Sequence, residues 1–206
     1  MKLSVISDIH EKWHELTIPE SDVLIICGDM FNDKGKTLMD FLTWLRDQPC
    51  RFKLFIGGNH DFTLEGMKPR HYGDGIYYLA DSEISIDGVK FYGTPWTPYL
   101  TNWAFTMPKS KNARYEVWSK IPEDTDILIT HTPPRNILDH PTGRPDVRLG
   151  CSQLLKRVEE LPNIKYHFFG HIHASRGQEG RYVNASSTPG RSVRPRTLLP
   201  PMEFEV

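Results

Sequence analysis

The chain has 206 residues, which fits a single domain that buries roughly 70% of the surface its unfolded form exposes. Its 25 Lys and Arg residues balance 26 Asp and Glu residues, for a net charge of −1. This balance argues against stable nucleic-acid binding, because proteins that bind polyanions normally carry a basic excess. It leaves open an enzyme whose site supplies its own cations.

The cysteines, the apolar stretches and the start of the chain bear on its compartment. Cys27, Cys50 and Cys151 form no C-x-x-C pair, which argues against a disulfide framework or a structural zinc site and predicts reduced, buried thiols. The apolar stretches reach only strand length, far below the ~18 residues of a membrane span. The first acidic residue, Asp8, comes too early for a signal peptide. We therefore expect a cytoplasmic protein with no membrane partner.

Apolar periodicity and turn residues predict the following elements in chain order: strand Leu3–Ser7, strand Val23–Cys27, helix Lys36–Gln48, strand Phe52–Ile56, a hairpin within Ile76–Gly93, helix Ser110–Lys120, strand Ile127–Thr130, helix Ser152–Leu161 and strand Tyr166–Phe169. Continuous apolar runs of this length are typical of strands covered on both faces. Asp87-Gly88 is the turn signal of the hairpin. We predict a second hairpin from Tyr166–Phe169 into Arg181–Ala185, and an irregular surface segment over Thr188–Pro201.

Histidines and carboxylates gather where the predicted strands end. They form five blocks: Asp8-Ile9-His10, Gly28-Asp29, Gly58-Asn59-His60-Asp61, Thr130-His131 and Gly170-His171-Ile172-His173. Ligands of open α/β sheets bind at the carboxyl ends of the strands, so we expect the blocks to share one site. Side chains two apart on extended backbone point the same way, which predicts that Asp8 and His10 face one cavity, as do His171 and His173. The glycines at 28, 58 and 170 suit sharp turns or a close approach of the backbone.

These donors are typical of a metal site. Carboxylate, imidazole and amide oxygen together suit Mn²⁺, Fe or Zn²⁺ better than Ca²⁺, and the supply is large enough for two ions. Any one block alone is mostly a turn or a core histidine, but five blocks in this order argue against coincidence. Among the remaining histidines we predict structural roles for His71, His140 and His167. His14 follows the first block on a loop that we expect to rim the site.

The five blocks resemble the motifs D-x-H, G-D, G-N-H-D/E, H and G-H-x-H of the calcineurin-like metallophosphoesterase superfamily. The stretches 91–98, 120–122, 126–134 and 183–186 are similar to its metallophosphoesterase-domain-containing subgroup, first described from vertebrate fetal brain. Some vertebrate members of that subgroup have glycine in place of the first histidine of the last motif, whereas this chain keeps His171. The resemblance implies an α/β fold, a four-layer α/β/β/α sandwich of two mixed sheets flanked by helices, over residues 1–206 as a single domain.

The resemblance also implies two divalent metal ions, with Mn²⁺ favoured and Fe, Zn²⁺ or Ni²⁺ as alternatives. Carried over by position, the first ion is expected on Asp8, His10 and His173. The second is expected on Asn59, His131 and His171. Asp29 is expected to bridge both ions. His60 is expected over the substrate phosphate with Asp61 orienting it, although Asp61 is equally well explained as a strand-end cap.

Contacts with substrate are predicted for His14, Arg135 and Trp96. Arg135 would meet a phosphate or a ribose, but it is more simply explained as a solvated loop arginine. The aromatic stretch from Trp96 to Trp103, with Tyr99, is typical either of a base-stacking loop or of a small satellite core. Asn184-Ala185-Ser186 is formally a glycosylation sequon, which we expect to stay unmodified because no secretion signal precedes it.

The reaction implied is hydrolysis of a small phosphodiester, such as a cyclic nucleotide, by in-line attack of a hydroxide held between the ions. The alternatives are a phosphomonoesterase or protein phosphatase, a nuclease, and a non-catalytic scaffold. Protein phosphatases usually carry G-D-x-x-D-R-G. After Gly28-Asp29 this chain reads Asp33-Lys34-Gly35, one residue farther along, with Lys34 in place of the arginine. The length and charge leave little room for the DNA-binding elements of a nuclease, and the intact ligand positions argue against a scaffold. The oligomeric state stays open.

Overall fold

The computed structural model describes residues 1–32, 36–98, 101–144, 146–189 and 197–206. The strands are β1 (Lys2–Ile6), β2 (Ser21–Ile26), β3 (Cys50–Phe55), β4 (Arg70–His71), β5 (Ile76–Tyr78), β6 (Ser82–Ile86), β7 (Val89–Thr94), β8 (Ile127–Thr130), β9 (Tyr166–Phe169), β10 (Gly177–Glu179), β11 (Tyr182–Asn184) and β12 (Met202–Glu205). The helices are α1 (Leu38–Arg46), α2 (Lys111–Trp118) and α3 (Ser152–Glu159), with 3₁₀ turns η1 (Trp13–Glu15), η2 (Phe62–Leu64) and η3 (His173–Ser175).

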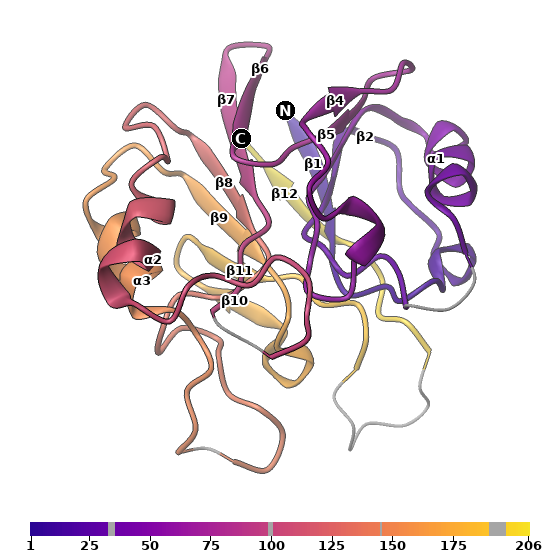
Figure 1. Cartoon of the computed structure of the whole chain (residues 1–206). Coiled ribbons are helices and arrows are strands. Elements are labelled where there is room, and N and C mark those ends of the chain that lie inside the picture. Colours follow the sequence, from indigo (N-terminus) through magenta and orange to yellow (C-terminus); the bar gives the residue numbers. More distant parts are fainter. Residues whose placement is uncertain (33–35, 99–100, 145, 190–196) are drawn as a thin grey trace.

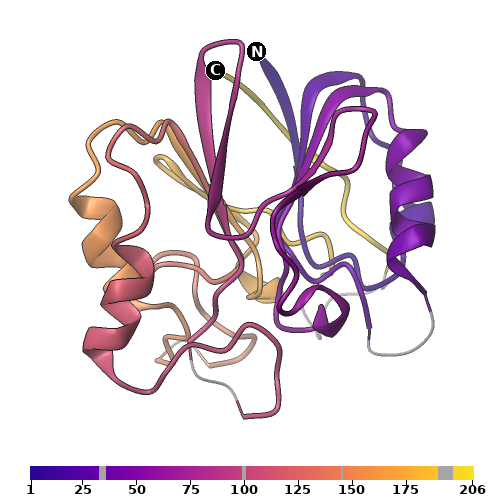
Figure 2. The ribbon, with the colours of Figure 1, turned by 45° about the horizontal axis from the view of Figure 1, so that its top comes forward.

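Two mixed sheets face each other between layers of helix. One sheet has the order β12-β1-β2-β3-β5-β4 and the other β10-β11-β9-β8-β7-β6. In each, four parallel strands lie between two antiparallel edge strands. Helix α1 covers the outer face of the first sheet, and α2 and α3 cover the outer face of the second (Figures 1 and 2). This is the predicted α/β/β/α sandwich.

Apolar residues on both faces of the strands explain why the strand sequences are continuously apolar. Along β2, Val23 and Ile25 face the cluster between the two sheets, and Leu24 and Ile26 face the cluster under α1. A third cluster lies under α2 and α3 and contains Trp118. The five strands and three helices predicted singly from the sequence are all present, each boundary within two residues of its prediction.

One predicted hairpin is confirmed and the other is wrong. Strands β6 and β7 pair antiparallel around Asp87 and Gly88, whose φ angles of 49° and 82° are those of a tight hairpin turn. Strands β9 and β11, by contrast, pair in parallel. The chain between them passes through η3 and β10, which reverses its direction once more, so the antiparallel partner of β11 is β10.

The C-terminal end of the chain returns to the N-terminal strand. Residues 202–205 form β12, which pairs antiparallel with β1, and the Val206 amide donates to the Met1 carbonyl at 3.0 Å. The predicted irregular segment 188–201 contains no strand among its described residues, and its residues 190–196 lie outside the described part of the chain. None of the helices in the described ranges combines the length and apolar content needed to cross a membrane.

The predicted structural role of His167 has a clear physical basis. The residue is fully buried in β9, and its Nε2 lies 2.8 Å from Thr130 Oγ1. The hydroxyl itself donates to the Thr132 carbonyl at 2.8 Å, so the imidazole Nε2 donates to the hydroxyl oxygen. Nδ1 is buried without a hydrogen-bond partner. Burial, reinforced by the charge of Arg181, lowers the pKa of His167 to about 3.

We expect His167 to make stability depend on pH. The unfolded chain binds a proton on this residue with a pKa of 6.5, whereas the folded chain stays neutral down to about 3, so stability is lost as the pH falls through this window. Between about pH 7 and about pH 5, the free energy of unfolding in urea should fall by about 2 kcal/mol more for the wild type than for His167→Gln. Equal pH dependence in the two proteins would contradict a neutral, buried imidazole.

Candidate metal centre

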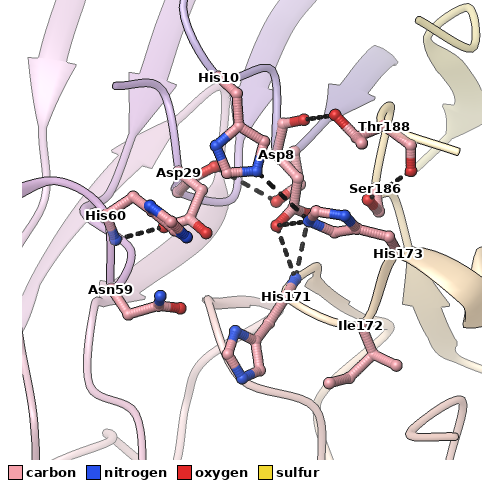
Figure 3. Close-up of polar contacts among 12 residues, drawn as sticks. Asp8, His10, Asp29, Asn59, His60, His171, Ile172, His173, Ser186 and Thr188 are labelled. Atoms are coloured by element: carbon pink, nitrogen blue, oxygen red, sulfur yellow. Dashed lines mark hydrogen bonds and ion pairs between the residues drawn. The ribbon is translucent and has the colours of Figure 1, made fainter. Parts of the chain in front are cut away.

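The candidate ligands lie at the carboxyl ends of strands from both sheets (Figure 3). The first sheet contributes the residues that follow β1, β2 and β3, and the second those that follow β8 and β9; they are Asp8, His10, Asp29, Asn59, His60, His131, His171 and His173. Asp8 and His131 are fully buried, and Asp29 is 2% exposed. At the edge where the two sheets meet, Asp8, Asp29 and His131 are therefore shielded from water, whereas the other histidines are partly exposed.

Left-handed backbone, which the sequence analysis did not foresee, aims these side chains. Asp8, His10, Asp29 and His171 have φ angles of 55°, 42°, 54° and 67°. Non-glycine residues rarely adopt this region, and it costs of order 1–3 kcal/mol when held at a functional site. The expectation of extended backbone is therefore wrong for the first and last blocks. His171 and His173 belong to different ligand groups, although both line one hollow.

Gly58 and Gly170 let the backbone pass close to two carboxylates of the centre. A Cβ on Gly170 would lie 2.0 Å from Ser7 Oγ and 2.3 Å from Asp8 Oδ2. A Cβ on Gly58 would lie 2.3 Å from Asp29 Oδ1. All three distances are far shorter than any normal contact, so only glycine allows the backbone to pass this close to the two carboxylates.

The first ligand group joins the two sheets. Its members are Asp8 and His10 from the first sheet and His173 from the second, with their ligand atoms within 4.8 Å of one another. His173 Nε2 lies 3.3 Å from Asp8 Oδ1 and 3.4 Å from His10 Nε2. The His171 amide donates to both oxygens of Asp8, at 3.1 and 3.0 Å (Figure 3).

The second ligand group comprises Asp29, His131 and His171. His131 Nε2 lies 3.3 Å from Asp29 Oδ2 and 3.1 Å from Asn59 Oδ1, which places the Asn59 amide beside the group. Asp29 also belongs to a third group, with His10 and His60, and its Oδ1 accepts the His60 amide at 2.8 Å. Asp29 therefore belongs to the second ligand group and also lies close to His10 of the first.

The donor atoms fit a metal ion. His131 Nδ1 donates to the Cys27 carbonyl at 2.8 Å, which leaves the lone pair of a neutral ring on Nε2, facing the oxygens of Asp29 and Asn59. Acceptor atoms that face one another repel unless a proton or a cation lies among them. Carboxylate, imidazole and amide oxygen form a set that Mn²⁺, Fe and Zn²⁺ accept.

Opposite charges in the two groups shift the pKa values of their members. Burial raises the pKa of Asp29, but the charge of His131 and its hydrogen bond outweigh burial and lower it to about 2. Asp29 in turn overcomes burial and raises the pKa of His131 to about 9. For Asp8, contacts with His173 outweigh burial and hold the pKa well below its usual range. Burial and the charge of His131 lower the pKa of His171 to about 4. Ionised carboxylates and a neutral His171 are the states that bind metal.

The sequence of this centre and its surroundings matches one known family. The profile of the calcineurin-like phosphoesterases matches residues 1–175, the stretch that contains every candidate ligand. The chain belongs to the calcineurin-like phosphoesterase family. A solved crystal structure that shares 14% of its residues superposes with a TM-score of 0.66 over 92% of this chain and 90% of its own, which supports the fold.

Among curated relatives, human metallophosphoesterase domain-containing protein 1 is 35% identical over 212 residues. The match covers 88% of this chain and 64% of the human protein, so the chain spans about two thirds of that relative's length. The UPF0046 protein K07C11.7 of Caenorhabditis elegans is 36% identical over 221 residues, covering 97% of this chain and 74% of the worm protein. These similarities place the chain in the subgroup predicted from its sequence.

The residues predicted to touch substrate lie outside the ligand groups. His14 is exposed in η1, and its Nε2 accepts from Trp13 Nε1 at 3.1 Å. Arg135 is exposed, and Trp96 Nε1 donates to both oxygens of Asp81 at 3.0 Å. Their binding roles stay predictions. Tyr99, and the Lys34 position that argues against a protein phosphatase, lie outside the described residues.

Trp103 is the aromatic residue that reaches the centre. Its ring lies edge-on to His60, with centroids 4.3 Å apart, and His60 lies 4.9 Å from the ring of His10 on another side. In the sequence, Trp96 and Trp103 belong to one aromatic stretch. The irregular backbone of this loop gives no periodicity from which to choose between the two tryptophans, so only the structure identifies Trp103.

Asp61 binds backbone amides with both carboxylate oxygens. Oδ2 accepts from Asp29 at 2.8 Å and from Gly58 at 2.7 Å, and Oδ1 accepts from Phe31 at 2.9 Å. Burial and the charge of Asp29 raise the pKa of Asp61 to about 8, against the effect of these amides. Asp61 therefore ties the end of β2 to the end of β3, as the capping interpretation requires. An orienting effect on His60 stays a prediction.

Asp61→Asn distinguishes the two roles. If Asp61 is a cap, the new amide group turns an N–H donor toward the Phe31 or Gly58 amide and should lower the free energy of unfolding by about 1–3 kcal/mol, measured in urea. A variant as stable as the wild type but with a lower kcat would instead show that Asp61 acts through His60.

Proposed function

We propose that the protein is a metal-dependent phosphoester hydrolase that acts on small phosphodiesters. The observation that carries this proposal is the pair of ligand groups that lie beside a common carboxylate, Asp29, at the edge between two sheets. Two-metal hydrolases hold their ions about 3.5–4 Å apart so that both contact one phosphoryl group. Membership of the calcineurin-like phosphoesterase family supports the same reaction class.

In this proposal, Asp8, His10 and His173 hold one divalent ion, Asn59, His131 and His171 hold the other, and Asp29 contacts both. We favour Mn²⁺ because it accepts oxygen and nitrogen ligands together. When bound, the ions supply positive charge at the phosphoryl oxygens and lower the pKa of water toward neutrality.

His60 is the proposed proton donor and charge stabiliser for the phosphate. Its backbone amide is fixed on Asp29 Oδ1 at 2.8 Å, and its ring packs against Trp103 and His10. A half-buried imidazole held in this way keeps one orientation toward the ligand groups. It can stabilise charge on a phosphoryl oxygen or protonate the leaving oxygen.

A hollow beside the second sheet's ligands favours a phosphodiester. It has a volume of about 270 Å³ and is lined by Pro141, Thr142, Leu149, His171, Ile172, His173 and Ala174. Among these described residues there is no lysine or arginine, which the extra negative charge of a monoester would favour. Leu149, 42% exposed, offers apolar surface to the organic group of an ester. Cyclic nucleotides and aryl diesters are the proposed substrate classes.

Asn59→Ala and His60→Ala separate metal binding from chemistry. Asn59→Ala should lower the metal content of the purified protein toward one ion, because an amide oxygen ligand is lost. His60→Ala should keep both ions while kcat falls ~10²–10⁴-fold, the usual contribution of a positioned acid. Elemental analysis and steady-state kinetics measure the two effects. His60 also lies in a ligand group with His10 and Asp29. If His60→Ala loses metal and Asn59→Ala does not, His60 is the metal ligand and Asn59 acts in the chemistry.

Substrate class is tested with a diester and a monoester that share one aryl leaving group, at saturating Mn²⁺. We expect a higher kcat/KM for the diester, and loss of activity when a chelator is added. Asp29→Asn, which alters the ligand common to both ions, is the control for contaminating phosphatases and should be inactive. A monoester preference of about tenfold or more, equal to ~1.4 kcal/mol in transition-state binding, would favour the phosphomonoesterase alternative.

A further inference from the structure

A short polar segment that starts at the last residue of β11, residues 184–188, runs beside the first ligand group. It follows the part of the chain that matches the family profile, which ends at residue 175, and it contains the formal sequon Asn184-Ala185-Ser186. Asn184, Ser186 and Ser187 are fully buried. Most buried polar side chains bind other groups. Here Asn184 donates to the Ile172 carbonyl and Ser186 to the Thr188 carbonyl, whereas the Ser187 hydroxyl is buried without a partner.

Thr188 binds the backbone of Asp8. Its Oγ1 donates to the Asp8 carbonyl at 2.5 Å (Figure 3), and the preceding amide, of Ser187, donates to the Ser7 carbonyl at 2.7 Å. The Asp8 carbonyl belongs to the peptide that leads to Ile9 and His10. Because Asp8 and His10 both have left-handed backbone, the direction of this peptide decides where two ligand side chains point.

Asn184 binds the backbone that leads to the third ligand. Its Nδ2 donates to the Ile172 carbonyl at 3.0 Å and to the Leu138 carbonyl at 3.2 Å. The Ile172 carbonyl belongs to the peptide that joins this residue to His173. Asn184 Oδ1 accepts the Ser186 amide at 3.1 Å, so the same side chain also shapes the segment that carries Thr188.

Arg176 anchors the segment from outside. Its guanidinium donates to the Ser186 carbonyl at 2.8 Å and to the Pro200 carbonyl at 2.6 Å. Ser7 and Ser186 also form a parallel bridge between the ends of β1 and β11. These contacts bind the segment to both sheets in addition to its contacts with the loops that carry the candidate ligands.

We propose that Asn184 and Thr188 are positioning residues for the metal ion held by Asp8, His10 and His173. In the other ligand group, His131 and Asp29 are held in a different way, through the Cys27 carbonyl and the Asp61 carboxylate. Its third member, His171, shares the Asp8 contact. Loss of an Asn184 or Thr188 bond therefore weakens the first metal site more than the second. This inference rests on the proposed function, because it requires a protein that binds two ions.

The test is Mn²⁺ binding to the metal-free protein, measured by titration calorimetry. Thr188→Val removes the hydroxyl and keeps the shape, and should weaken one of two binding steps about tenfold, the lower end for residues that orient metal ligands. Thr188→Ser restores the donor and should restore the affinity. Asn184→Asp keeps the acceptor for Ser186 but loses the donor to Ile172, and should weaken the same step.

Thr125→Val is the matched control. Thr125 is a fully buried threonine whose Oγ1 donates to the Pro122 carbonyl at 2.9 Å, away from the ligand groups. It should lose stability in urea like Thr188→Val yet bind both ions as the wild type does. If Thr188→Val and Asn184→Asp bind both ions like the wild type, or if both steps weaken equally in them and in Thr125→Val, the positioning role is wrong. A wild type that binds fewer than two ions would instead overturn the proposed function.

Discussion

The buried carboxylate of Asp8 is the constraint on which the arrangement of the two sheets depends. A fully buried anion is unfavourable unless hydrogen bonds and opposite charge replace its hydration. Both come from the other sheet, as the His171 amide and the His173 imidazole. Apolar contacts between the sheets have no preferred direction, whereas these polar contacts require one alignment of the two sheets. Gly170 is the residue that lets the sheets close to this distance.

The centre is organised at the expense of local backbone energy. Left-handed residues cluster in the loops after β1, β2 and β9, and each costs more than a residue in ordinary extended backbone. Three apolar clusters, two of them on the outer faces of the sheets, offset this cost. Preorganised ligands need no rearrangement when a cation arrives, which favours binding. The apolar clusters therefore stabilise the fold, whereas the left-handed loops at its edge position the candidate ligands.

Parts of this structure could be predicted from the sequence because they depend on local pattern. Continuous apolar runs such as Ile127–Thr130 identify strands covered on both faces, and the order of the five blocks identifies the centre. The direction of β11 could not be predicted, because it depends on whether one more reversal, at β10, precedes it. The φ angles of Asp8 and His171 could not be predicted either, since no glycine marks them. The contacts of Thr188 depend on tertiary proximity alone.

The distance along the chain between Asp8 and Thr188 has a consequence for biosynthesis. The chain is synthesised from its N-terminal side, so Asp8 is made 180 residues before Thr188, and β1 is made before its partner β12. The emerging chain can collapse on its apolar strands before His173, Asn184 and Thr188 exist. The Asp8 and Asp29 loops are therefore present long before the rest of the candidate ligand set. Under the proposed function, both metal sites become complete only after Thr188 has been made.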